Sequence, residues 1–199
     1  EINLSIYTTW DSITMIDRRG EEKISISNFA DQTIGSEAIM ERQKLFDQLS
    51  DGRLVYSDVY FKDDQRSRPV ISFMAPVIGD NEEITGAVIV DVDWLEIVRS
   101  FDQFSVIHKI HLLNNQGLEI LETKEEDFNY ILNQKYLEAD FIYRNSHDLG
   151  KYLAERKKNM SGEDYLISVI RQQGDNDYRG SGWILFTEEP QATVFSSAR

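Results

Sequence analysis

The chain has 199 residues, and 21 Lys and Arg against 35 Asp and Glu give it a formal charge of −14. Such an acidic chain repels phosphate backbones and anionic lipid surfaces, so we expect it to bind neither nucleic acid nor a membrane surface. A hydrophobic content of 41% is enough for a folded core, and the absence of cysteine excludes disulfide scaffolds, thiolate metal sites and cysteine nucleophiles.

The ends of the chain carry no targeting signal. The chain begins with Glu1, lacks the basic and apolar regions of a signal peptide, and has no apolar run near the roughly 20 residues that span a bilayer. Because the chain starts at Glu1 instead of Met, we expect it to be a piece of a longer protein.

Landmarks recur along the chain in the same order, at an offset of about 95 residues. Residues 13–20 and 110–117 each contain an apolar stretch, an Asp or Asn and then a Gly, which is the turn chemistry of a β-hairpin. Residues 79–91 and 174–186 each lead from a Gly-Asp-Asn turn into an apolar strand. The pattern predicts an α+β fold made of two copies of one unit, each an antiparallel sheet flanked by helices.

In the first copy, the hairpin is followed by a helix and three strands. Apolar residues at helical spacing predict a helix over residues 36–49, which ends before Gly52. The polar tips between the next apolar runs are short, so these runs are expected to pair as an antiparallel meander. The predicted strands are residues 54–61, 69–77 and 84–92, with residues 62–67 as one polar tip and residues 94–104 as a connecting helix.

The second copy starts near Ser105. The capping-box pattern of residues 123–126 predicts a helix that begins just before Phe128. Apolar spacing predicts another amphipathic helix over residues 149–160. Two strands close the copy, over residues 165–172 and 183–187, with Pro190 just beyond the last one.

No motif for catalysis or metal binding is present in the sequence. His108 and His111 are three residues apart in a predicted strand, so their side chains point to opposite faces and do not share a metal ion. His147 precedes a predicted helix and is expected at the surface or as a cap. Nucleotide-binding and hydrolase motifs are absent, and most carboxylates fall in polar tips. We therefore predict no catalytic residue, no cofactor and no metal site.

One group of polar residues is a candidate ligand site. Asp91 ends an apolar strand, where a carboxylate is costly unless it is paired or exposed. Arginine and lysine on the predicted helix, and alternating residues of the first meander strand, would converge on Asp91 if helix and sheet face each other. The alternative is that Asp91 frays at the strand end and Tyr60 packs in the core. The candidates are Arg42, Lys44, Tyr56, Asp58, Tyr60 and Asp91.

The segment from Arg42 to Asp93 resembles the double Cache family of sensor domains. It carries VYSDVY (55–60), RPVISFMAPV (68–77) and GAVIVDVD (86–93), and the closing GWILFTEEP (182–190) is also similar to the family's last strand. Family members are the extracytoplasmic sensors of bacterial chemoreceptors, histidine kinases and diguanylate cyclases. The resemblance implies a periplasmic or extracellular location and a non-enzymatic fragment.

The resemblance also implies two tandem PAS-like modules on a long N-terminal helix, in a receptor that forms a homodimer. Residues 1–98 would be the membrane-distal module with the ligand pocket, and residues 99–199 the membrane-proximal module. Ligand binding would then shift the long helix against its partner in the dimer.

Members that bind amino acids share a motif of Tyr, Arg, Trp, a second Tyr and Asp. Arg42, Tyr60 and Asp91 match three positions, while Glu37 and Lys44 stand in place of the first Tyr and the Trp. In such a site, Arg would hold a carboxylate and Asp an ammonium group. The resemblance therefore implies a small carboxylate or amino-acid-like ligand, and Lys44 would suit a dicarboxylate.

The leading hypothesis is thus a small-molecule-sensing input domain of a transmembrane receptor. The alternative is a ligand-free periplasmic scaffold or interaction module with the same fold. An acidic secreted hydrolase has only the excess of carboxylates in its favour.

Overall fold

The computed structural model divides into two compact units, Glu1–Arg99 and Ser100–Arg199, and each is described by itself. It describes residues 9–28, 33–49, 52–101, 109–123, 128–129, 134–135, 153–158, 164–174 and 180–196. Both units are built on antiparallel sheets with few helices, which confirms the predicted α+β class.

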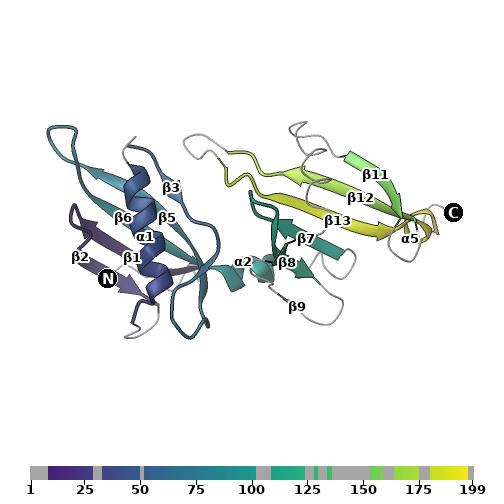
Figure 1. Cartoon of the computed structure of the whole chain (residues 1–199), viewed down its shortest axis with the longest axis horizontal. Coiled ribbons are helices and arrows are strands. Elements are labelled where there is room, and N and C mark those ends of the chain that lie inside the picture. Colours follow the sequence, from purple (N-terminus) through teal and green to yellow (C-terminus); the bar gives the residue numbers. More distant parts are fainter. Residues whose placement is uncertain are drawn as a thin grey trace. The chain divides into compact units, whose positions relative to one another are not determined.

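The first unit is an antiparallel sheet with helix α1 across one of its faces (Figure 1). Its strands are β1 (Trp10–Asp17), β2 (Glu22–Ser27), β3 (Val55–Tyr56), β4 (Tyr60–Phe61), β5 (Pro69–Ile78) and β6 (Ile84–Asp93), and its helices are α1 (Ser36–Gln48) and α2 (Trp94–Ser100). The strand order is β2-β1-β6-β5-β3, with β4 also paired to β5. The predicted hairpin and meander are therefore confirmed.

Helix α1 packs its apolar side onto the sheet, as the helical spacing predicts. Leu45 and Leu49 are buried in one cluster with Ile16, Met74 and Ile89 from three strands. Each such side chain contributes roughly 1.5–3 kcal/mol to stability when it is fully buried. This cluster fixes the position of the second half of α1 on the sheet.

Both hairpin turns use the same local chemistry. Asp17 Oδ1 accepts hydrogen bonds from the backbone amides two and four residues later, and Asn114 Oδ1 does the same in the second unit. Gly20 and Gly117 follow with φ of 77° and 79°, in the left-handed region that glycine adopts without steric cost. The predicted turns are thus confirmed in both copies.

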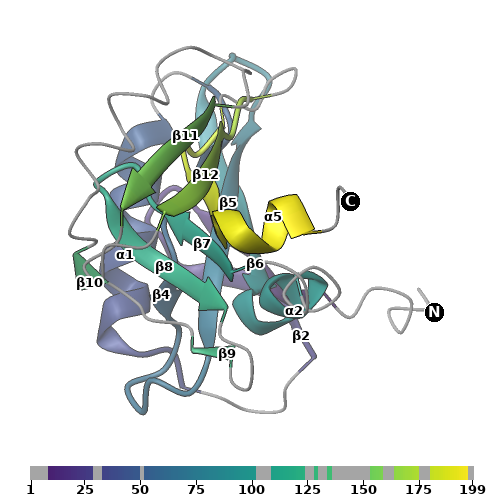
Figure 2. The ribbon, with the colours of Figure 1, turned by 90° about the vertical axis from the view of Figure 1, so that its right-hand side faces the viewer.

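The second unit repeats the strand order of the first. Its elements are β7 (Lys109–Leu113), β8 (Leu118–Thr123), β9 (Phe128–Asn129), β10 (Gln134–Lys135), β11 (Leu153–Lys158), β12 (Asp164–Arg171), β13 (Ile184–Pro190) and α5 (Gln191–Ser196). The order is β10-β8-β7-β13-β12-β11, with β9 also paired to β8, and its part β8-β7-β13-β12-β11 matches the order β2-β1-β6-β5-β3 of the first unit. Figure 2 shows β11 and β12 side by side at the edge of this sheet.

Two helices predicted in the second unit are wrong. Within residues 149–160 the described part is strand β11, which pairs with β12 from Leu153 opposite Val169 to Lys158 opposite Asp164. Phe128 and Asn129 form β9, which pairs with β8 instead of starting a helix. In both segments, pairing with a distant strand overrides a local helical pattern.

Two strand boundaries also differ from the prediction. The predicted strand 54–61 is interrupted, because β3 and β4 are separate two-residue strands on β5. Strand β13 includes Pro190 as its last residue, where a missing amide donor is tolerated.

Of the predicted connecting helix, α2 confirms residues 94–100, and residues 102–104 lie outside the described residues. The capping-box residues 124–126, Ser105, His108 and His147 lie outside them as well.

Gly86 allows a close approach of β6 to β1, and we expect Gly86→Ala to destabilise the first unit. A Cβ at this position would overlap the backbone carbonyl oxygen of Ile16. Such overpacking costs about 1–3 kcal/mol, measurable by urea unfolding. The control Thr85→Ala changes an exposed side chain of the same strand and should stay within about 0.5 kcal/mol of wild type. Equal stabilities of the two variants would contradict the close approach.

Candidate functional site

Asp91 lies on the face of β6 that α1 covers, and its side chain is 0% exposed. Four donors surround its carboxylate: Ser12 Oγ at 2.9 Å, Lys62 Nζ at 2.7 Å, Arg42 Nη2 at 3.1 Å, and Ser72 Oγ. They come from β1, the tip after β4, helix α1 and β5. The alternative of a frayed, solvent-exposed Asp91 is therefore wrong.

A second buried carboxylate, Asp11, extends this group of charges. Asp11 contacts both Lys62 Nζ and Arg68 Nη2, so Lys62 bridges the two carboxylates. The pairing of β1 with β6 shifts register between Trp10 and Ser12, which leaves Asp11 without a cross-strand partner in that ladder. We call Asp11, Arg42, Lys62, Arg68 and Asp91 the buried charge network; its formal charge is +1.

Tyr60 joins the network through Ser72. Ser72 Oγ donates its hydrogen to Asp91, so the hydrogen bond of 2.6 Å between the two hydroxyls has Tyr60 as donor. Burial raises the pKa of the Tyr60 hydroxyl, with a further contribution from the Asp91 charge, and the hydroxyl therefore remains a donor at neutral pH. Its ring packs with Ala38 and Val70, so Tyr60 is both a core residue and a network residue.

The pKa of Asp91 lies below its ordinary value of 3.8. Burial by itself raises this pKa, but the charges of Lys62 and Arg42 and the hydrogen bonds from Lys62 and Ser72 together lower it further. Asp91 is therefore ionised at neutral pH, and its charge is compensated from within the unit.

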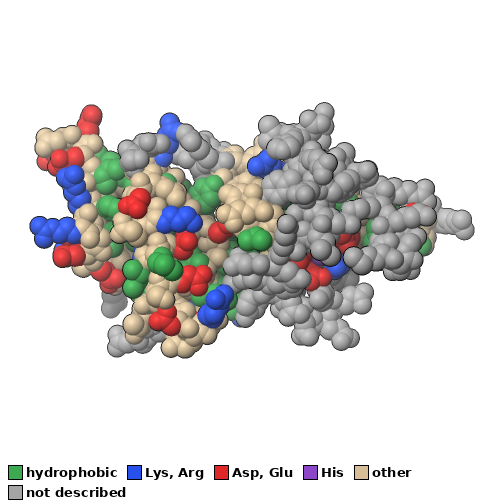
Figure 3. Space-filling model, viewed as in Figure 1, with side chains coloured by type: hydrophobic (Ala, Val, Ile, Leu, Met, Phe, Trp, Pro, Cys, Tyr) green, Lys and Arg blue, Asp and Glu red, His purple; other side chains and the backbone are tan. Residues whose placement is uncertain are grey.

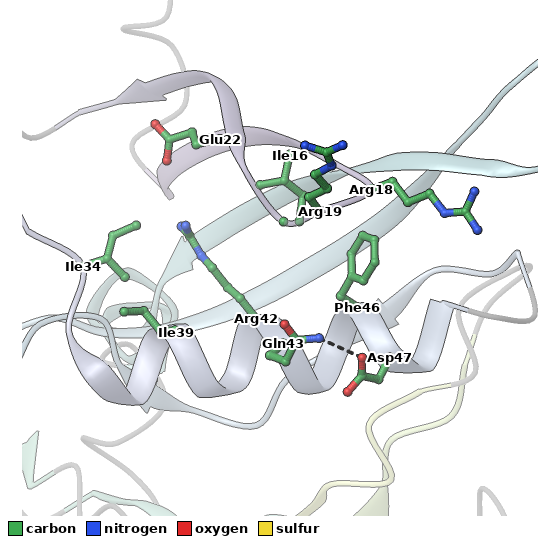
Figure 4. A pocket seen from close by; sticks show the side chains of 11 residues that line it. Ile16, Arg18, Arg19, Glu22, Ile34, Ile39, Arg42, Gln43, Phe46 and Asp47 are labelled. Atoms are coloured by element: carbon green, nitrogen blue, oxygen red, sulfur yellow. Dashed lines mark hydrogen bonds between the residues drawn. The ribbon is translucent and has the colours of Figure 1, made fainter.

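A cavity of about 410 Å³ adjoins the network between α1 and the β1–β2 hairpin (Figure 4). Its lining residues are Ile16, Arg18, Arg19, Gly20, Glu22, Ile34, Ile39, Arg42, Gln43, Phe46 and Asp47. Arg42 rises from α1 towards the hairpin and belongs to both the cavity and the network. Its Nε is a buried donor for which the described residues provide no acceptor.

The structure brings together three of the six predicted site residues: Arg42, Tyr60 and Asp91. Lys44 instead points to solvent, with 60% of its side chain exposed, and pairs with Glu41 at 3.3 Å. The predicted common face of Tyr56, Asp58 and Tyr60 is wrong, because the chain is irregular between β3 and β4.

Tyr56 lies on the opposite face of the sheet from Tyr60. Its cross-strand partner is Phe73, at a ring distance of 6.4 Å, whereas Tyr60 packs beneath α1. Asp58, between the two strands, is half-buried.

Sequence reasoning missed Lys62, Arg68 and Asp11. Lys62 falls in what we predicted to be a polar tip, yet only 7% of its side chain is exposed. The ion pairs that hold Lys62 in the interior are not local, because its partners Asp11 and Asp91 lie 51 and 29 residues away in the sequence. Arg18 and Arg19 were part of a recognised turn, but their place beside α1 was not predicted.

The second unit has a different buried polar group. His111 is buried, its Nδ1 contacts Glu119, and its ring stacks on Phe186 with 4.5 Å between centroids. Within the described ranges, no group of three His, Asp or Glu side chains is arranged to hold a metal ion.

The face of the first unit seen in Figure 3 shows acidic, basic and apolar side chains interspersed, without a continuous patch of one kind. Among the helices that the structure describes, none is both long and apolar enough to cross a bilayer.

Solved structures of extracytoplasmic sensory domains share this fold. The periplasmic sensory domain of the Campylobacter jejuni chemoreceptor Tlp1 is similar over 98% of this chain and 76% of its own, with 13% identity and a TM-score of 0.67. The extracellular domain of the histidine kinase vpHK1S-Z8 is similar over 96% and 71%, with 16% identity and a TM-score of 0.60.

The ligand-binding domain of the Pseudomonas aeruginosa amino-acid chemoreceptor PctB, in complex with L-Arg, is similar over 96% of this chain and 70% of its own, with 14% identity and a TM-score of 0.61. No family model and no curated protein sequence matches the chain. At these identities, the likeness establishes the PAS-like fold of such sensory domains.

We expect Asp91→Asn to destabilise the first unit at neutral pH by about 3 kcal/mol, because it breaks a buried ion pair. The folded-state pKa of Asp91 lies below the unfolded value, so its contribution is fully present above about pH 4 and is lost as the pH falls through the folded-state pKa. Urea unfolding at pH 7 and below pH 4 should therefore show the gap between wild type and variant closing in acid.

The control Lys44→Ala removes only an exposed ion pair and should cost less than about 1 kcal/mol at either pH. A gap for Asp91→Asn that does not change with pH would show that the Asp91 charge contributes nothing to stability.

Proposed function

We propose that the chain is the extracytoplasmic, small-molecule-sensing input domain of a bacterial transmembrane signalling receptor. The receptor would be a chemoreceptor, histidine kinase or diguanylate cyclase, and the ligand a small carboxylate or amino-acid-like molecule. The observation that carries the proposal is the position of Arg42, which lines a cavity and also belongs to the buried charge network.

A buried charge network is poorly explained by a structural role alone. Apolar residues of similar volume often stabilise a protein as well as buried ion pairs do, because each buried ion loses several kcal/mol of hydration. Here Arg42 Nε is buried and has no acceptor among the described residues. An anionic ligand in the adjoining cavity would supply that acceptor.

The fold that this chain shares with solved sensory domains supports the same function. Several structural neighbours are named as chemoreceptor or kinase sensor domains, and the PctB domain is described with an amino acid bound. We assign the first unit as the membrane-distal, ligand-binding module and the second as the membrane-proximal module of a receptor that forms homodimers. Flanking helices would connect the domain to the membrane.

A ligand-free scaffold with the same fold is the competing function. The sensor and the scaffold differ in whether the cavity beside Arg42 binds small anions: a sensor would bind them there, and a ligand-free scaffold would not. Binding experiments on this chain therefore separate the two.

We expect a thermal-shift screen of amino acids and small mono- and dicarboxylates to give at least one ligand that raises the melting temperature in a concentration-dependent manner. Arg42→Ala should weaken its binding at least tenfold, because it removes a charge-assisted partner in a largely buried site. Lys44→Ala is the matched control on the same helix and should bind like wild type. A ligand that binds Arg42→Ala as tightly as wild type would exclude Arg42 from the site.

Signalling would follow from a shift of packed helices. A ligand moves an equilibrium only by its difference in affinity between two states, and helix interfaces repack in small discrete steps. In a full-length receptor that carries this chain, we expect ligand to change disulfide crosslinking between single cysteines introduced in the flanking N-terminal helices of the dimer. Unchanged crosslinking with ligand bound would contradict this mechanism.

A further inference from the structure

We propose that the cavity in the first unit binds an organic monoanion with an apolar body, in preference to a dicarboxylate or a small polar anion. This inference rests on the proposed function and narrows its ligand class. Its basis is the composition of the cavity lining, in which apolar side chains from α1 and the segment before it lie across from the β1–β2 hairpin (Figure 4).

The wall of the cavity on the side of α1 is largely apolar. Ile34 and Ile39 line one end of it, and Phe46 points from α1 towards the hairpin (Figure 4). Ile39 is 61% exposed, although it is a large apolar residue. An apolar ligand group that covers Ile39 removes this surface from water, which is favourable, whereas a charged group placed against the same wall loses hydration.

The ionisable side chains of the lining leave room for one negative charge. Three arginines, Arg18, Arg19 and Arg42, stand against Glu22 and Asp47, so the formal charge of the lining is +1. A monoanion neutralises this charge, and a dianion reverses it. The apolar wall therefore supplies the gain in affinity with ligand size, and the charge of the lining favours one carboxylate over two.

Arg42 supplies the buried donor for the ligand carboxylate. Only 13% of its side chain is exposed, and its Nε has no acceptor among the described residues. Lys44, the other cation of α1, pairs with Glu41 at the surface and does not line the cavity, so α1 offers no second cationic anchor. The volume of about 410 Å³ lies in the range of roughly 300–1,000 Å³ that small-molecule sites have, so it accommodates a six-carbon chain.

Acetate, hexanoate and adipate test this ligand class, because they separate chain length from charge. Each is titrated into the whole chain by calorimetry at pH 7. We expect hexanoate to bind at least about tenfold more tightly than acetate, because its methylene groups are buried against the apolar wall. We also expect it to bind at least about tenfold more tightly than adipate, which has the same number of carbons and a second carboxylate.

Equal or tighter binding of acetate or adipate would overturn the inference and leave the proposed function intact. The same holds if hexanoate does not bind while an amino acid or another anion of the thermal-shift screen does. If none of the amino acids and anions binds, both the proposed function and this inference are overturned.

Ile39→Ala tests the contribution of the apolar wall. Because Ile39 is exposed, we expect the variant to fold like wild type, to bind hexanoate at least about threefold more weakly and to leave acetate binding unchanged. Met40→Ala is the matched control, since Met40 is 65% exposed on the same helix but does not line the cavity. Equal hexanoate affinities of Ile39→Ala and Met40→Ala would overturn the role of the wall.

Glu22→Gln tests the charge of the lining. This change keeps the shape of an exposed side chain and raises the formal charge of the lining to +2. We expect adipate to gain at least about threefold in affinity relative to hexanoate. Glu83→Gln, in the exposed turn between β5 and β6, makes the same change in net charge outside the cavity and should leave the ratio as in wild type. A ratio that Glu22→Gln does not change would overturn the preference for one carboxylate on grounds of charge.

Discussion

The ion pair between Lys62 and Asp91 is the contact on which the polar interior of the first unit depends. Removing two charges from water costs several kcal/mol per ion, and their attraction offsets this only when further hydrogen bonds are well placed. Here those bonds come from Ser12 on β1 and Ser72 on β5, so three strands must be in register before Asp91 is compensated. The apolar cluster around Leu45 requires the same register, and polar and apolar interactions therefore specify one arrangement.

The parts of this structure that could be predicted are those set by neighbours in the chain. Asp17 and Gly20 determine a hairpin turn within a few residues, and apolar spacing alone predicts α1. The pairing of Arg42 with Asp91 was one of the two possibilities that the sequence offered, because a carboxylate in an apolar strand is costly unless a cation pairs with it. The repeated landmarks likewise predict the hairpin and the closing strands of the second unit.

The parts that could not be predicted depend on distant partners. Lys62 begins a polar, charged stretch that is typical of an exposed tip, and its burial is decided by Asp11, far away on β1. Strand β11 contains the sequence LAERKK, which suits a helix by local preference, yet its ladder with β12 decides its conformation. Tyr56 and Tyr60 are four residues apart, and only the break between β3 and β4 places them on opposite faces.

In the proposed function, Arg42 would connect an anion in the cavity to the buried charge network. If its guanidinium turns partly towards a ligand carboxylate, Asp91 loses some of that pairing but keeps Lys62 at 2.7 Å. The exchange therefore avoids an unpaired buried charge, which would otherwise cost about 3–5 kcal/mol. Because α1 carries Arg42, we expect the two pairings to favour different positions of α1 on the sheet. A ligand can shift such an equilibrium only by its difference in affinity between the two positions, and a change of partner at one guanidinium creates that difference.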